Sequence, residues 1–129
     1  MTKVICAEDC GNAPRKLLLK DLSVAFADGD VGALLDLIAD DVVLNIIGDR
    51  RTVGRDGFRD AILENGRRKA KELHLHNIIT HGATGAVNGT LKMDDNRWVE
   101  YCDVFVFSGA GIKAKIKEIT SYRIDIGNR

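Results

Sequence analysis

The apolar residues in the first half of the chain recur with the period of amphipathic helices. The apolar positions after Pro14 are three and four residues apart: Leu18, Leu19, Leu22, Ala25 and Phe26. This spacing predicts a helix over residues 14–28 with one buried face. Gly29 can end that helix in a left-handed conformation, and Asp30 can cap a second helix over residues 31–39. A third helix is expected over residues 55–69.

The second half of the chain has the two-residue alternation of β-strands. A first strand is expected at residues 42–47, with Thr52 and Val53 pairing back onto it. Four more are expected at residues 73–80, 86–93, 97–107 and 113–126. Helices followed by a run of strands indicate an α+β fold rather than an alternating α/β fold. We therefore expect a single domain over residues 1–129, with a flexible N-terminal segment at residues 1–12.

Charge and hydropathy exclude several classes of function. Lys and Arg together number 19, as do Asp and Glu, so the net charge gives no general attraction to nucleic acid. The basic residues Arg67, Arg68, Lys69 and Lys71 follow the third predicted helix, where cations complement the helix dipole. No segment approaches the ~20 apolar residues of a membrane span. We expect a cytoplasmic protein without nucleic-acid or membrane partners.

Neither the cysteines nor the histidines form a metal-binding pattern. Cys6, Cys10 and Cys102 are an odd number without paired zinc-ligand spacing, so free thiols in a reducing compartment are expected. His74 and His76 share one face of a predicted strand, a spacing that can hold a metal ion. Only His81 stands nearby as a third ligand. We therefore expect surface or interface histidines, and neither a metal nor a cofactor.

Several segments together resemble the nuclear transport factor 2-like (SnoaL-like) superfamily, whose fold is also called cystatin-like. They are Ala-Asp-Gly-Asp at 27–30, the stretch 34–41, Gly48 with Val-Gly-Arg at 53–55, the strand 102–107 with the glycine turn 109–111, and residues 115–122. The resemblance covers about residues 15–126. It implies three N-terminal helices packed on a strongly curved, mainly antiparallel sheet. Such a sheet forms a cone with a pocket, and these domains commonly dimerise through the outer sheet face.

The ketosteroid isomerase branch of this superfamily gives a test at individual residues. That chemistry needs a carboxylate base and an oxyanion hole made of a tyrosine and a protonated aspartic acid. The resemblance puts the oxyanion aspartate at Asp103 but the tyrosine at Leu22. It puts the base at Ile46, or at Asn45 with a shift of one residue. Because Leu, Ile and Asn cannot do this chemistry, steroid-type isomerisation is not expected.

Asp103 remains open to two interpretations. It is either a pocket acid that hydrogen-bonds a ligand oxygen, or an ordinary strand aspartate satisfied by Tyr101, Tyr122 or a backbone donor. In either case we expect it to be buried, with its pKa raised by desolvation. The residues expected to bind a ligand are Leu44, Ile46, Phe58, Tyr101, Asp103, Phe105 and Tyr122.

Three functional hypotheses follow. The first is a homodimeric domain whose mainly apolar pocket binds a small organic molecule without a complete catalytic set. The second is a polyketide cyclase- or isomerase-type enzyme that uses Asp103 as acid or base. The third is an interaction module whose own side chains fill the cavity, leaving less than the ~300 Å³ of a functional pocket. Strand alternation puts the dimer contact on the outward residues Trp98, Cys102, Val104 and Val106.

Overall fold

A computed structural model of the protein describes residues 2–6, 14–65, 69–111 and 113–128. In chain order the elements are β1 (Lys3–Cys6), α1 (Pro14–Asp28), α2 (Val31–Leu35), β2 (Ile38–Ile46), β3 (Arg50–Val53), α3 (Arg55–Asn65), β4 (Ala70–His81), β5 (Thr84–Met93), β6 (Arg97–Phe107) and β7 (Ile116–Asn128). The α+β class and the order of helices and strands predicted from the sequence are confirmed.

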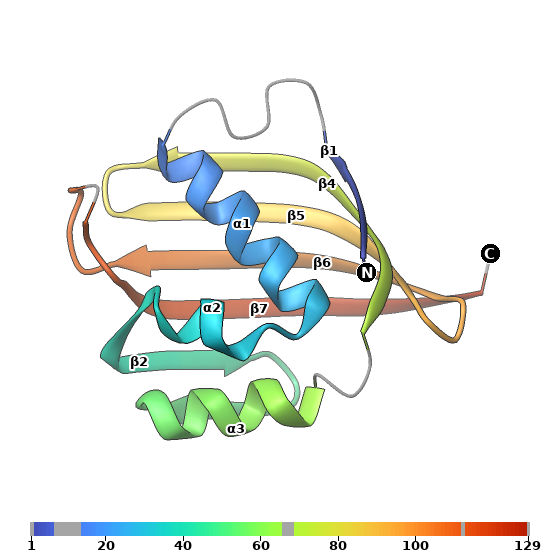
Figure 1. Ribbon diagram of the computed structural model, residues 1–129, viewed down its shortest axis with the longest axis horizontal. Coiled ribbons are helices and arrows are strands. Elements are labelled where there is room, and N and C mark those ends of the chain that lie inside the picture. Colours follow the sequence, from blue (N-terminus) through green and yellow to red (C-terminus); the bar gives the residue numbers. More distant parts are fainter. Residues whose placement is uncertain (1, 7–13, 66–68, 112, 129) are drawn as a thin grey trace.

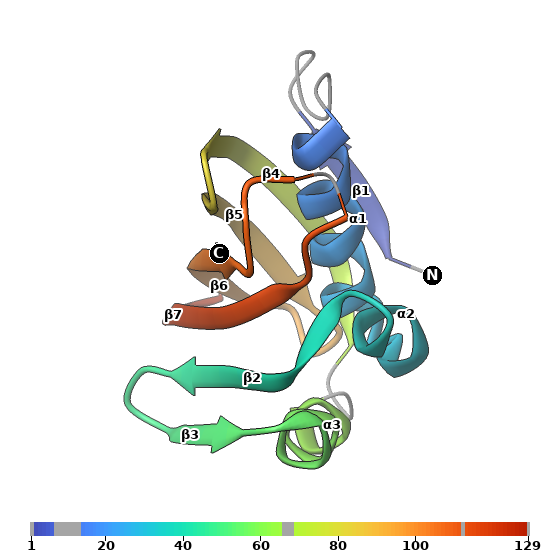
Figure 2. The ribbon, with the colours of Figure 1, turned by 90° about the vertical axis from the view of Figure 1, so that its left-hand side faces the viewer.

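The strands form one sheet in the order β1-β4-β5-β6-β7-β2-β3. Most neighbours are antiparallel, and the two exceptions among the described strands are the parallel pairs β1–β4 and β2–β7. α1 lies across the sheet, whereas α3 lies beside β2 (Figure 1). The side view shows the helices on one side of the sheet, which bends around them (Figure 2). The sheet thus has an inner face toward the helices and an outer face away from them.

The corner between α1 and α2 follows the sequence closely. Gly29 has a φ of 69°, a backbone conformation that glycine adopts without a steric penalty. The Asp30 carboxylate caps α2 by accepting a hydrogen bond from the Ala33 backbone N–H at 3.2 Å. The expected length of α2 was wrong, because the chain enters β2 at Ile38. That residue pairs with Ile116 of β7, so sheet pairing decides its conformation.

α3 is anchored at its first residue and is shorter than predicted. The Arg55 guanidinium donates to the backbone oxygens of Leu35 at 2.9 Å and Ile38 at 3.2 Å, which ties α3 to the end of α2. The helix ends at Asn65 rather than at residue 69, and β4 begins at Ala70. Of the basic run, residues 67 and 68 lie outside the described part of the chain.

Residues 3–6 differ from the expectation of a flexible N-terminal segment over residues 1–12, whereas residues 7–12 lie outside the described part of the chain. Lys3–Cys6 forms the edge strand β1, which runs parallel to β4 and pairs Cys6 with Leu75. Thr2 supports it by donating its hydroxyl to the Ala70 oxygen at 2.8 Å. A four-residue strand carries too little alternation to be recognised without its partner strand.

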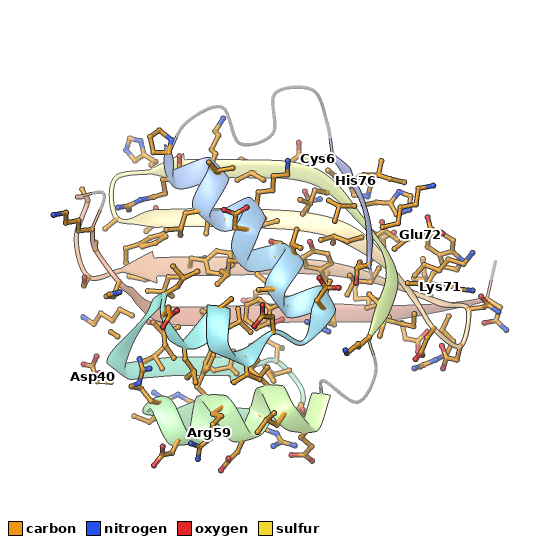
Figure 3. The ribbon with its side chains drawn as sticks, viewed as in Figure 1. Cys6, Asp40, Arg59, Lys71, Glu72 and His76 are labelled. Atoms are coloured by element: carbon orange, nitrogen blue, oxygen red, sulfur yellow. The ribbon has the colours of Figure 1, made fainter. Side chains whose placement is uncertain are left out.

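The expectation of three free thiols is also wrong. Cys6 is disulfide-bonded, whereas Cys102 is free. Cys10 lies outside the described residues. Cys6 and His76 lie on the neighbouring strands β1 and β4 (Figure 3). No helix in the described part of the chain is long and apolar enough to cross a membrane.

The core lies between the helices and the inner sheet face. Leu19 and Leu22 of α1 are fully buried against it, as are Phe58 of α3 and Phe105 of β6. The alternation predicted for β6 is confirmed, because its buried residues are Tyr101, Asp103, Phe105 and Phe107. This alternation brings one carboxyl group, Asp103, into a mainly apolar interior.

Candidate functional site

A cavity of about 320 Å³ opens between α1 and the inner face of the sheet. Its wall is mainly apolar and includes Leu44, Ile46, Ile62, Leu73, Met93 and Val99. A volume of this size reaches the ~300 Å³ at which small-molecule pockets begin. The third hypothesis, a cavity filled by the domain's own side chains, expected a smaller volume than this.

Neighbouring residues of β6 and β7 form a polar group on the cavity wall. In the antiparallel register Asp103 lies opposite Ser121, and Tyr101 lies opposite Arg123. Opposed residues of such a pair share a face, with Cβ atoms about 5 Å apart. All four residues line the cavity. The pleat of two adjacent strands thus gathers a carboxyl, a hydroxyl, a phenol and a guanidinium on one apolar wall.

Gly89 on β5 makes room for the Tyr101 ring. A Cβ atom at this position would lie 2.3 Å from the His74 backbone oxygen and 2.9 Å from Cε1 of Tyr101. Both distances are far below van der Waals contact. A glycine is therefore required at position 89, opposite Tyr101 in the β5–β6 register. This close approach packs the Tyr101 ring against bare backbone and fixes its orientation.

Two buried polar atoms on the cavity wall lack partners. Within the described residues neither Tyr101 Oη nor Asp103 Oδ1 has a hydrogen-bond partner. The exposed fractions of the two residues are only 7% and 4%. An unsatisfied polar group in a protein interior costs ~1–3 kcal/mol, so such groups are uncommon in folded proteins.

Burial also favours the neutral form of both groups. It raises the pKa of Asp103, and this effect outweighs the opposing influence of the Arg123 cation and the Ser121 hydroxyl. It raises the pKa of Tyr101 too, with a further contribution from the Asp103 charge, whereas the Ser23 hydroxyl and the Arg123 cation oppose the rise. A protonated carboxyl and a phenol are both hydrogen-bond donors. Below the raised pKa of Asp103 the cavity therefore presents two adjacent neutral donors.

The cavity becomes more exposed along β7, from the buried Ser121 to the exposed Arg123 and Asp125. Beside Asp125 on the wall lies Arg97. Its guanidinium donates to Asp95 Oδ2 at 2.8 Å and to Asp125 Oδ2 at 2.6 Å. These bonds occupy the Arg97 side chain at the rim.

Comparison with known proteins decides the family. The SnoaL-like domain pattern matches residues 19–118, most of the chain. The chain belongs to the SnoaL-like family. No curated protein sequence matches this SnoaL-like domain.

Solved structures of nuclear transport factor 2-like proteins share its fold. An NTF2-like protein of unknown function from Cytophaga hutchinsonii is 24% identical, with a TM-score of 0.65 over 82% of this chain and 96% of the other. The epoxide hydrolase/cyclase-like enzyme SalBIII, which has a role in pyran ring formation in the polyether salinomycin, is 18% identical, with a TM-score of 0.68 over 85% and 90%. A protein with a cystatin-like fold from Silicibacter pomeroyi is 18% identical, with a TM-score of 0.67 over 82% and 72%. At these sequence identities the similarity is evidence for a shared fold alone.

The structure of this SnoaL-like domain divides the predicted ligand-binding residues into three groups. Leu44, Ile46, Tyr101 and Asp103 line the cavity, so a binding role for them stays a prediction. Phe58 and Phe105 are fully buried in the core and do not line it. Tyr122 lies on the outer face, 46% exposed, because it pairs with the outward-facing Cys102.

Sequence reasoning missed the polar partners that β7 and α1 bring to the cavity. Ser121, Arg123 and Asp125 follow the alternation of β7, and Ser23 comes from α1. The alternation was visible in the sequence. However, the register that sets Arg123 beside Tyr101 needs the sheet pairing.

The positions compared with the ketosteroid isomerase branch are now located. Leu22 is fully buried in the core, and Ile46 lines the cavity. Asn45 does not line it. The wall instead carries a different carboxylate, Asp49, in the turn after β2. Its Oδ2 lies 3.7 Å from Nε of Arg50.

The outer sheet face combines apolar and polar patches. Val104 is 37% exposed and Ile124 on β7 is 66% exposed, whereas Cys102 and Val106 are half-buried. Burial raises the pKa of the Cys102 thiol, with a contribution from the Asp103 charge. Their role in a dimer stays a prediction.

His74 and His76 of β4 take part in side-chain hydrogen bonds. His74 Nε2 lies 3.0 Å from Glu72 Oε1, and its ring centroid lies 5.8 Å from that of Trp98. His76 Nε2 lies 2.8 Å from the Thr90 hydroxyl. Figure 3 shows Glu72 and His76 along β4. Among the residues described, no three His, Cys, Asp or Glu side chains are grouped to hold a metal ion.

Proposed function

We propose that the domain binds a small organic molecule in the inner cavity, with an oxygen atom of the ligand accepting hydrogen bonds from Tyr101 and protonated Asp103. The observation that carries the proposal is the pair of buried polar atoms, Tyr101 Oη and Asp103 Oδ1, that lack partners on the cavity wall. A ligand carbonyl would satisfy both donors. The surrounding Leu, Ile, Val and Met side chains would then bury its apolar body.

A matched pair of probes tests this proposal. para-Isopropylacetophenone and para-diisopropylbenzene have nearly the same shape and differ in one carbonyl oxygen. The wild-type chain should bind the ketone about ten-fold more tightly by calorimetry, because the hydrocarbon leaves the two donors unpaired. Tyr101→Phe and Asp103→Leu should each reduce this preference for the ketone without weakening the binding of the hydrocarbon. Equal affinity for the two probes, or binding of neither, would overturn the proposal.

The same pair of donors favours a second candidate, an enzyme of cyclase or isomerase type. Donors aimed at a carbonyl oxygen stabilise the negative charge that develops there when a proton leaves the neighbouring carbon. In this reaction the carbon proton would pass to a base, and Asp49 is a carboxylate on the same wall. The electron pair of the broken C–H bond would move onto the oxygen held by Tyr101 and Asp103.

Deuterium exchange separates the enzyme from the binder. The acetyl methyl protons of para-isopropylacetophenone exchange with D₂O through its enol or enolate, and NMR follows the loss of their signal. Catalysed exchange in the wild-type chain that Asp103→Leu and Asp49→Asn abolish supports the enzyme. Tight binding with exchange at the background rate supports the binder alone.

The outer face supports the remaining part of the proposal, a homodimer. Val104, Tyr122 and Ile124 expose apolar surface on adjacent strands, and a groove of about 440 Å³ lies beside them. Monomers rarely leave a large contiguous apolar patch in water. A second copy related by a two-fold axis would cover the same patch on both chains at once.

A further inference from the structure

Arg123 occupies a distinctive position on the cavity wall. It lies opposite Tyr101 in the β6–β7 register, one pair of residues beyond the buried pair of Asp103 and Ser121. Arg123 itself is exposed, so its guanidinium stands where the cavity meets solvent. The influence of its charge reaches inward, because it opposes the rise in pKa of both Tyr101 and Asp103.

The two arginines of the cavity wall differ in their partners. Arg97 is held by two carboxylates, at 2.8 Å from Asp95 and 2.6 Å from Asp125. Arg123 forms no hydrogen bond or ion pair with any residue that the structure describes. Asp125 accepts from Arg97 through Oδ2 and from the Gly127 N–H through Oδ1 at 2.8 Å, and no hydrogen bond or ion pair joins it to Arg123 in the described part of the chain. The guanidinium N–H groups of Arg123 are thus free to donate hydrogen bonds to an anion.

We infer that the cavity takes an amphipathic organic anion, whose charged group binds Arg123 at the mouth while its apolar body and a second oxygen extend inward to Tyr101 and Asp103. The inference rests on the proposed function, since it assumes a ligand on those two donors. A planar guanidinium matches a carboxylate with two parallel hydrogen bonds. The ligand class is therefore an aryl or alkyl carboxylate that carries a carbonyl or hydroxyl group at its other end.

Asp49 is the competing charged group on the wall. Its carboxylate stands 3.7 Å from Arg50, and Arg50 binds Glu64 more closely at 2.6 Å. A cationic ligand could therefore pair with Asp49. The position of Arg123 directly beside the two unpaired donors favours the anion, because one rigid ligand can reach all three groups on adjacent strands.

Three probes that differ only in charge test the inference. para-Acetylbenzoate, para-acetylbenzamide and para-acetylbenzylamine keep the ketone and place an anion, a neutral amide or a cation at the far end. Affinities are measured by calorimetry for the wild type, Arg123→Gln and Arg123→Lys. Arg51→Gln is the matched control. It removes the same charge from an exposed residue of β3 that lies opposite Asn45, off the cavity wall.

The benzoate should bind the wild type about ten-fold more tightly than the amide. This preference should vanish in Arg123→Gln, persist in part in Arg123→Lys, and stay unchanged in Arg51→Gln. It should also shrink as salt is added, because exposed charges are screened. Circular dichroism checks that each variant is folded.

The outcomes separate this inference from the proposed function. Equal binding of benzoate and amide, a preference that survives Arg123→Gln, or tightest binding of the amine would overturn the anion inference. If the amide still depends on Tyr101 and Asp103 in those cases, the proposed function stands. If none of the three probes binds while para-isopropylacetophenone does, the inference fails and the proposed function stands. If that ketone does not bind either, both fail.

Discussion

Replacing Asp103 by asparagine should remove a dependence of stability on pH whose sign is opposite to the usual one for a carboxyl group. Asparagine has nearly the same shape and stays neutral at every pH, so the variant isolates the ionisation of one carboxyl group. Asp103 is 4% exposed, and burial raises its pKa above the ~3.9 of an unfolded chain. Between these two pKa values the unfolded chain has lost this proton and the folded chain still holds it.

The sign and size of the effect follow from this difference in bound protons. Stability falls with rising pH wherever the folded state binds more protons. Below about pH 4 wild type and Asp103→Asn should differ by a constant. Above it, wild type should lose up to ~1.4 kcal/mol of unfolding free energy per pH unit relative to the variant, until folded Asp103 ionises. Little solvent screening is expected, because the group is buried.

Urea unfolding followed by circular dichroism, from about pH 4 to about pH 8, measures this difference. Glu72→Gln is the control of opposite sign. The hydrogen bond with His74 holds the pKa of Glu72 below its ordinary value, so wild type should gain on this variant as the pH rises toward the ~4.3 of an unfolded Glu and stay constant above it. The series for this control therefore starts below about pH 4. Parallel curves for wild type and Asp103→Asn would refute the reasoning, as would a gain of wild type over Asp103→Asn with rising pH.

Two further substitutions test the packing of the site and the outer face. Gly89→Ala should cost about 3 kcal/mol of unfolding free energy and weaken ketone binding, because the new Cβ would meet a backbone oxygen at 2.3 Å and displace Tyr101. Gly109→Ala is the control, because its added Cβ would meet no atom within 4 Å, and its unfolding free energy should stay within about 0.5 kcal/mol of wild type. Equal losses of stability for the two variants in urea unfolding would contradict the role given to Gly89. Val104→Arg should yield monomers in light scattering, because an unpaired charge buried in a dimer contact costs several kcal/mol, whereas a monomeric wild type would refute the dimer.

The sequence by itself determined the elements whose periodicity is long and regular. Fifteen residues of helical spacing gave α1 its bounds, and Gly29 and Asp30 marked the corner after it. The alternation along β6 was enough to predict that Asp103 is buried on the same face as Tyr101. These features are local, because burial on one face of a helix or strand follows from the spacing of residues within that element.

The tertiary structure decided what depends on pairing between distant segments. Ile38 lies in a strand rather than in the predicted helix because it pairs with β7 in parallel. Lys3–Cys6 forms a strand because it pairs with β4. The same long-range pairing turned Tyr122 outward and brought Arg123 beside Tyr101. Strand register between β6 and β7 depends on the whole sheet and not on either strand alone. That is why the sequence predicted the buried acid of this cavity but not the cation at its mouth.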